Sequence, residues 1–284
     1  MPENYFRFEG RRIFQVDKAP IMARLERTQA DYAAHDHDFI EIVLTVAGSG
    51  RQRTAGRSQS LARGTLSILR PGHWHEYSHC RGLQIFNLCF GAELLRHELA
   101  WLIQDPLLAR LFWGANNPLL VRLNKKAVAR LEKLLTGFSA GENESYVPRI
   151  SRLALFLGIL AGELAPLLKS TPPLHPSVLF CLRQMEQDLA RPWTVTGLAR
   201  NCGCTPEYLI RLFRKSIGMT PYAYLSRCRG ERAVSLLTRT DKTIEEIASL
   251  VGWPEPCLFS RKFRQFYAMS PSEYRRRAGL KSFV

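Results

Sequence analysis

Three histidines and one glutamate in the N-terminal third have the residue types and spacing of a ligand site. The segment His35-x-His37-x3-Glu41 places two imidazoles and a carboxylate close together. Alternate residues of an extended strand point to the same face, so these side chains can converge on one face of a sheet. His75 supplies a further imidazole, after a Pro-Gly turn signal. The four groups offer either hydrogen bonds to an organic molecule or ligands to a metal ion.

Three interpretations of this cluster stay open. The first, which we predict, is a pocket for an organic effector in which His35, His37, Glu41 and His75 supply hydrogen bonds. The second is a metal site, octahedral with open coordination positions. The third is a structural remnant whose His and Glu side chains pair with one another. The first interpretation requires no catalytic residue, no metal and no cofactor.

An internal repeat in the C-terminal third points to a second kind of chemistry. The two copies are related by an offset of 49 residues at first, and of 50 residues after a one-residue insertion. Each copy predicts a short helix, a turn with a glycine and a longer helix, which is the layout of a helix-turn-helix unit. The matching segments are Leu198-Ala199-x3-Gly203 with Ile247-Ala248-x3-Gly252, Arg211-x-Phe213 with Arg261-x-Phe263, and Thr220-Pro221-x-x-Tyr224 with Ser270-Pro271-x-x-Tyr274.

The longer helix of each copy combines an apolar stripe with a basic face. The predicted stripes are Leu209, Leu212, Phe213 and Ile217 in the first copy, and Phe259, Phe263, Phe266 and Tyr267 in the second. Exposed arginine can bond guanine in the major groove or hold phosphate. One such helix would be read as an ordinary solvated surface, but two matching copies favour DNA recognition. The residues predicted to contact DNA are Tyr208, Arg211, Arg214 and Lys215 in the first copy, and Ser260, Arg261, Arg264 and Gln265 in the second.

The segment between the copies predicts one stiff helix over residues 220–237. At roughly 17 residues it would be about 25 Å long. A spacer of this size can hold two recognition helices near one turn of DNA apart, about 34 Å. A shorter separation would require bent DNA, or would leave one helix on the phosphate backbone.

The rest of the chain predicts a two-domain α+β protein. Short apolar runs bounded by Gly and Pro fill residues 1 to about 90 and predict strands, as in a barrel. Helical periodicity follows, at Val128–Phe138 and at Ile150–Leu164, and predicts a helical hairpin. Three prolines in residues 169–176 predict a linker. We therefore expect an effector-binding and dimerisation domain at 1–168, with a homodimer formed through 125–168, and an all-α domain with two helix-turn-helix units at 177–284.

Composition narrows the class of partner. The 284 residues carry 40 Lys and Arg against 25 Asp and Glu, a net charge of +15, which suits a polyanion such as nucleic acid. The hydrophobic fraction of 46% allows a core. The seven scattered cysteines are expected to be reduced. Without a signal-like N-terminus or a membrane-length apolar run, we expect a cytoplasmic protein that does not bind membranes.

Residues 178–278 resemble the DNA-binding domain of the AraC/XylS-type transcriptional regulators. The second copy departs from the family pattern: Pro254 and Pro256 flank Glu255, Cys257 replaces a serine, and Ala268 replaces a glycine. We therefore expect the first copy to carry most of the base specificity. The resemblance rests on Tyr208-Leu209-x-Arg211-Leu212-Phe213-Arg214-Lys215, Gly218-x-Thr220-Pro221, Ile244-x-x-Ile247-Ala248-x3-Gly252-Trp253 and Phe259-Ser260-Arg261-x-Phe263-Arg264.

Residues 20–90 resemble the cupin-like sensor barrel of these regulators, in particular of the rhamnose regulators. The second motif departs from the pattern, because one extra residue precedes Pro71 and Asn87 is not at the usual distance after His75. The resemblance implies an activator, not an enzyme, with promoter DNA, RNA polymerase and a small-molecule effector such as a sugar as partners. The alternatives are a metal-dependent cupin enzyme fused to a DNA-binding domain, and a ligand-independent regulator.

Overall fold

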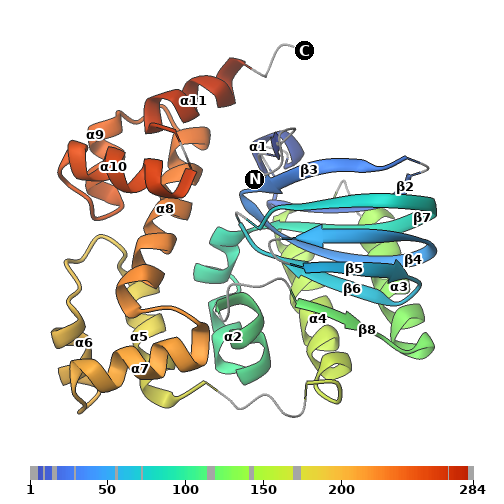
Figure 1. Ribbon diagram of the computed structural model, residues 1–284, viewed down its shortest axis with the longest axis horizontal. Coiled ribbons are helices and arrows are strands. Elements are labelled where there is room, and N and C mark those ends of the chain that lie inside the picture. The colour runs from blue at the N-terminus through green and yellow to red at the C-terminus, as the bar shows by residue number, and fades with distance from the viewer. Residues whose placement is uncertain are drawn as a thin grey trace. The chain divides into compact units, whose positions relative to one another are not determined.

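The computed structural model divides the chain into two compact units (Figure 1). The first unit comprises Met1–Trp101 and Asn117–Pro172, and the second comprises Leu102–Asn116 and Pro173–Val284. The first is rich in strands and the second is helical, so the predicted α+β class is confirmed. The described residues are 6–8, 10–14, 18–28, 30–54, 57–71, 73–113, 119–140, 144–168, 174–267 and 269–280. Residues 169–173 of the predicted linker lie outside them.

One sheet organises the described part of the first unit. Its order is β1-β3-β7-β4-β6-β8, with β2 also paired to β7 and β5 to β4. Only the pairing of β1 with β3 is parallel. The strands are β1 (Phe6–Phe8), β2 (Ile21–Thr28), β3 (Tyr32–His37), β4 (Phe39–Thr54), β5 (Arg57–Ala62), β6 (Thr65–Leu69), β7 (His75–Gly91) and β8 (Leu119–Arg122).

The two longest strands, β4 and β7, pair along their whole lengths and bend together. The start of β7 pairs with β3, whereas its second half pairs with β2. Register shifts between Thr45 and Arg51 mark bulges in β4, and bulges increase bending and twist. Gly48 lies there with φ +70°, and a Cβ at this position would lie 2.0 Å from the carbonyl oxygen of Gly82. Only glycine therefore permits this close approach of the two strands.

Two long helices belong to the first unit, α3 (Lys125–Ala140) and α4 (Tyr146–Leu164), as the hairpin prediction expected. Leu131 and Leu135 of α3 and Leu153 and Leu157 of α4 are buried, which matches the helical spacing of these apolar residues. Helix α3 packs against β2 and against α4. The shorter helices of this unit are α1 (Gly10–Ile13) and η1 (Ala92–Arg96), and η2 (Ala100–Gln104) spans the point in the chain where the second unit begins.

The second unit is built from helices that begin at side-chain caps. Thr194, Thr205, Thr220 and Thr243 each accept a hydrogen bond from a backbone N–H of the following turn, and Thr243 completes a capping box with Glu246. The helices are α2 (Pro106–Trp113), α5 (Pro176–Gln187), α6 (Val195–Asn201), α7 (Pro206–Ile217), α8 (Pro221–Arg239), α9 (Ile244–Leu250), α10 (Pro256–Tyr267) and α11 (Pro271–Leu280).

The position of α2 was not predicted. The chain leaves the sheet after β7, forms α2 and returns to the sheet as β8, but α2 packs against α7 in the second unit. Leu108, Ala109, Phe112 and Trp113 of α2 are buried. The apolar spacing of this helix was visible in the sequence, but its partner was not, because the contact joins segments almost 100 residues apart.

No helix in the described ranges has both the length and the apolar character needed to cross a membrane.

Candidate functional site

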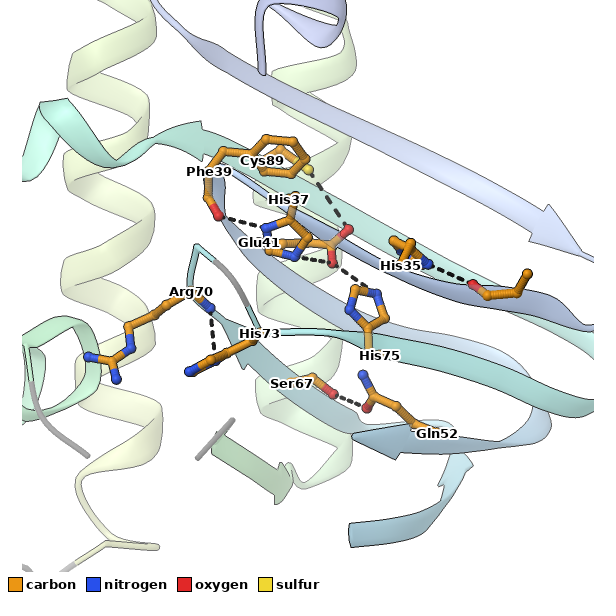
Figure 2. Close-up of polar contacts among 11 residues, drawn as sticks. His35, His37, Phe39, Glu41, Gln52, Ser67, Arg70, His73, His75 and Cys89 are labelled. Carbon is orange, nitrogen blue, oxygen red and sulfur yellow. Dashed lines mark hydrogen bonds and ion pairs between the residues drawn. The ribbon is translucent and has the colours of Figure 1, made fainter. Parts of the chain in front are cut away.

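Three neighbouring strands bring the predicted cluster together. His35 and His37 are alternate residues of β3, Glu41 lies on β4, and His75 begins β7 (Figure 2). The spacing had suggested that Glu41 lies on the same strand as the two histidines, but a bend at Asp38 ends β3 and places Glu41 on the next strand, β4. His75 is paired in register with His35. All four residues are at most 5% exposed.

The carboxylate of Glu41 lies between two imidazoles. Its Oε2 is 3.4 Å from His37 Nε2 and 3.3 Å from His75 Nε2. His37 Nδ1 lies 2.7 Å from the carbonyl oxygen of Phe39, to which only an N–H can donate. In the neutral tautomer, His37 Nε2 therefore points a lone pair at the carboxylate. Two acceptors face each other, and this arrangement favours a cation, either a proton or a metal ion, between them.

Burial and charge set the protonation of the cluster. Desolvation lowers the pKa of His75 to about 3, although the nearby Glu41 charge opposes this. Desolvation likewise lowers the pKa of His35. Burial by itself would raise the pKa of Glu41, but the adjacent imidazoles of His37, His75 and His35 outweigh it and lower the pKa to about 2, because a proton on a neighbouring ring stabilises the carboxylate. At neutral pH Glu41 is therefore a carboxylate, and His35 and His75 are neutral imidazoles, the forms that bind metals.

The cluster opens into a cavity of about 680 Å³. This volume lies within the usual range of small-molecule sites. Tyr77 is 5% exposed, and within the described part of the chain neither its hydroxyl nor the Oδ1 of Asn87 has a hydrogen-bond partner. These groups are free to bond a polar ligand. The described lining is Phe8, Ile13, Met22, Arg24, Leu25, Glu26, Arg27, Thr28, Tyr32, His35, His37, Phe39, Glu41, His75, Tyr77, Ile85, Asn87 and Cys89.

Several residues that line the cavity were not predicted from the sequence. Arg24 and Glu26 alternate along β2, a period-2 polar pattern that was a usable signal. Asn87, which is not at the family's usual spacing, still reaches the cavity and hydrogen bonds Glu26. Glu26 has a raised pKa, first because of burial and then because of the Glu41 charge.

Three of the four predicted residues have the geometry of metal ligands. One ligand atom each from His37, Glu41 and His75 lies within 4.8 Å of the other two. Ligands around a metal at about 2.1 Å are separated by roughly 3 to 3.4 Å, close to the two measured separations. The bond from His37 Nδ1 to a carbonyl is the usual second contact of a metal-binding histidine. His35 lies beside His75, with ring centroids 4.1 Å apart and ring planes tilted by 60°, and its Nδ1 lies 2.9 Å from the carbonyl oxygen of Ala33.

The first helix-turn-helix unit consists of α6, a turn and α7. Gly203 in the turn has φ +62°, a backbone conformation that glycine adopts at little cost. Leu209, Phe213 and Ile217 are completely buried, whereas Leu212 is only half-buried. The four residues of α7 that were predicted to contact DNA, Tyr208, Arg211, Arg214 and Lys215, are all exposed. The guanidinium of Arg211 lies 5.1 Å from the centre of the Tyr208 ring, which limits its freedom.

The second unit, α9 and α10, has the same layout but a different start. Helix α10 begins at Pro256 behind Glu255, whose carbonyl accepts the first helical hydrogen bond from Phe259. Phe259 and Phe263 are buried, but Phe266 is 40% exposed, so its predicted burial is wrong. Of the predicted contacts, Arg261, Arg264 and Gln265 are exposed and Ser260 is half-buried. Ala268 lies outside the described residues.

One continuous helix, α8, joins the two units, as predicted. Its 19 residues begin at the Thr220 cap and end at Arg239. Tyr224, Leu225 and Cys228 of its first half are buried, and in its second half Ala233, Val234 and Leu237 belong to the core of the second helix-turn-helix unit. Each copy of the repeat therefore packs on its own half of α8.

Comparison with known proteins connects both parts of the chain to one class of protein. Residues 198–277 match a family profile described as a helix-turn-helix domain, and residues 20–144 match one described as an AraC-like ligand binding domain.

Whole-chain relatives agree. The chain is 26% identical over 264 residues to the HTH-type transcriptional activator RhaS of Citrobacter koseri, covering 92% of this chain and 94% of that protein. It is also 26% identical over 271 residues to the HTH-type transcriptional activator RhaR of Escherichia coli (strain K12), covering 92% and 93%. The fold is similar to the crystal structure of ToxT from Vibrio cholerae O395, with a TM-score of 0.54, 14% identity, and coverage of 93% of this chain and 99% of that one.

Proposed function

Because the chain belongs to the AraC-type transcriptional regulators, we propose that a small molecule bound in the cavity of the first unit controls its activation of transcription. The chain is a sequence-specific DNA-binding regulator and not an enzyme. We assign sensing and dimerisation to residues 1–168 and DNA binding to 177–284. The proposed partners are promoter DNA and RNA polymerase, and the proposed location is the cytoplasm. The observation that carries the effector proposal is the cavity of about 680 Å³, into which the Tyr77 hydroxyl and the Asn87 Oδ1 bring polar atoms that have no hydrogen-bond partner among the described residues.

The chemistry of the lining favours a small polar effector with several oxygen atoms, such as a sugar or a hydroxy acid. In this proposal His35, His37, Glu41 and His75 bind the effector by hydrogen bonds. Tyr77 and Asn87 add a hydroxyl and an amide from β7. Apolar residues such as Phe8 and Ile85 complete the lining and suit the carbon face of such a molecule.

A second candidate is a metal-dependent form of the same site. The convergence of His37, Glu41 and His75 favours it, because two imidazole nitrogens lie at ligand distance from one carboxylate oxygen. A divalent ion there would supply open coordination positions to an effector with oxygen donors.

Thermal unfolding of the chelator-treated protein separates these candidates. An organic effector at 100 times its Kd is expected to stabilise the protein by about 2.7 kcal/mol, which is about 5–10 °C for a unit of this size. Glu41→Gln should abolish the shift, and His79→Asn, which changes an exposed imidazole, should retain it.

Stabilisation by zinc or manganese alone, lost in Glu41→Gln, would favour the metal form. Stabilisation by a sugar or acid without metal would favour hydrogen bonding alone. If no metal, sugar or acid stabilises the protein, the effector proposal fails and a ligand-independent regulator remains.

We propose that two copies of the chain pair through residues 125–168, with α4 at the contact. Val147 and Leu155 are 70% and 56% exposed, although both are apolar. Gly158 and Gly162 continue this face, and a Cβ added to either glycine meets no atom within 4 Å. A helix of a second copy can therefore approach closely along this face.

Leu155→Glu is expected to shift the protein from dimer to monomer, because it buries a charge in the proposed contact. Sedimentation equilibrium at micromolar concentration measures the change. Arg81→Glu, at an exposed position of β7 outside residues 125–168, is the matched control and should stay dimeric. A Leu155→Glu protein that remains dimeric would show that α4 does not form the interface.

A further inference from the structure

The turn of the second helix-turn-helix unit packs against the segment that leads into the first unit. Gly252, in the turn between α9 and α10, has φ +81°. A Cβ at this position would lie 2.7 Å from the carbonyl oxygen of Leu189 and 2.7 Å from Nη2 of Arg229. Leu189 lies between α5 and α6, in the segment that precedes the first unit. The turn of the second copy therefore packs on the segment from which the first copy begins.

The equivalent glycine of the first copy has no such neighbours. Gly203 has φ +62°, yet a Cβ added there meets nothing within 4 Å. Both turns therefore need a residue that accepts positive φ, but only Gly252 also lacks space for a side chain. The difference separates the conformational requirement of the turn from the close contact between the copies.

Arg229 holds the other side of this contact. It projects from α8 and is 6% exposed. Its Nε donates to the carbonyl oxygen of Leu189, and its Nη2 donates to that of Arg191, both at 2.8 Å. Two bonds from one planar group fix the direction of the segment that they hold.

The segment held by Arg229 is itself ordered by local bonds. The Asp188 carboxylate accepts from the backbone N–H groups of Ala190 and Arg191, both at 3.1 Å. Trp193 Nε1 donates to the Asp188 carbonyl oxygen at 2.8 Å. The cap of α6 follows directly, so the position of this segment sets where the first helix-turn-helix unit begins.

We infer that Arg229, Leu189 and Gly252 form a clamp that fixes α7 relative to α10, and that this clamp determines the half-site spacing that the protein accepts. The inference rests on the proposal that both helices contact DNA. Helix α8 packs on each copy with a different half of its length. The clamp adds a contact between the turn of the second copy and the segment that precedes α6. One base pair of extra spacing displaces a half-site by about 3.4 Å and rotates it by roughly 34°. A rigid pair of helices cannot follow such a change, whereas a loosened pair can.

The test uses the full chain and a duplex selected by it from a random library. The half-sites are then moved by one or two base pairs in either direction, and a duplex with only the first half-site is included. For the unaltered protein, a shift of one base pair should weaken binding about tenfold, comparable to one mismatched pair. Gly252→Ala and Arg229→Met should weaken binding to the selected duplex by a similar factor, bind the shifted duplexes within about threefold of it, and bind the single half-site as before.

Gly203→Ala is the matched control, because it imposes the same positive-φ strain without the contact. It should keep the sharp dependence on spacing. The clamp is refuted if Gly252→Ala and Arg229→Met keep that dependence. It is also refuted if both variants lose as much affinity for the single half-site as for the selected duplex. Arg229→Met alone decides the matter if Gly252→Ala does not fold by circular dichroism. An unaltered protein that is indifferent to spacing would overturn both the clamp and the use of two recognition helices, whereas sharp spacing retained in the variants overturns only the clamp.

Discussion

Arg211→Ala is expected to weaken binding to the preferred promoter site by about 1–3 kcal/mol and to relax base preference at one position. Each 1.4 kcal/mol is about tenfold in affinity. Arg211 is exposed on α7, and its guanidinium is held over the Tyr208 ring. A guanidinium that is already oriented loses less freedom when it forms a bidentate bond to guanine.

Two matched variants distinguish base contacts from phosphate contacts. Lys215→Ala, in the last turn of α7, should weaken binding to all sequences alike and reduce the dependence of log affinity on log salt by about one. Arg261→Ala tests the second copy, for which we expect a smaller and less selective loss, because α10 starts between two prolines. Fluorescence anisotropy with the preferred duplex and its single-base variants measures all three. An Arg211→Ala protein that retains both affinity and base preference would refute the recognition role of Arg211.

The metal-free protein is expected to lose stability as the pH falls below about 6.5. His75 is protonated near pH 6.5 in the unfolded chain, but burial lowers its folded pKa to about 3. The unfolded state therefore binds more protons in that interval, and acid favours it. Glu41 acts in the same direction at lower pH, since its folded pKa is about 2. Its stabilising contribution is complete above about pH 4.5 and disappears toward pH 2, and the combined loss is on the order of a few kcal/mol.

Urea unfolding of chelator-treated protein at pH 8, 6, 5 and 4 measures this loss. His75→Asn should flatten the dependence of the midpoint on pH between 6 and 4, because the asparagine does not titrate. His79→Asn removes an exposed imidazole and should leave the dependence unchanged. The same slope in the His75→Asn and unaltered proteins would show that His75 is not the residue responsible.

The helical part of the fold was predictable because its signals are local. Caps at Thr205, Thr220 and Thr243 lie within a few residues of the backbone groups that they satisfy, and the structure confirms them. Because the motif occurs twice, each copy independently supported the prediction of a helix-turn-helix unit in the other. The error at Phe266 has a physical cause, since a helical period identifies an apolar residue without showing whether enough neighbours exist to cover it.

The sensing site was only partly predictable because strand pairing creates it. His35 and His37 are neighbours in sequence, and their convergence follows from the alternation along β3. Glu26 and Asn87 come together through the pairing of β2 with β7, which no local pattern reveals. The partner of α2 was hidden for the same reason, because long-range packing decides it.

Helix α2 lies between two strands of the sensing unit in sequence but belongs to the helical unit, and this limits how the DNA-binding part can be fused to other sensor domains. A gene fusion that joins residues 174–284 to a foreign sensor would leave behind the helix that carries Leu108 and Phe112, and would expose the apolar surface that those residues cover. The compact unit that contains both helix-turn-helix units therefore includes residues 102–116 as well as residues 173–284. We expect a functional chimera to require residues 102–116, or a sensor domain that supplies a helix equivalent to α2.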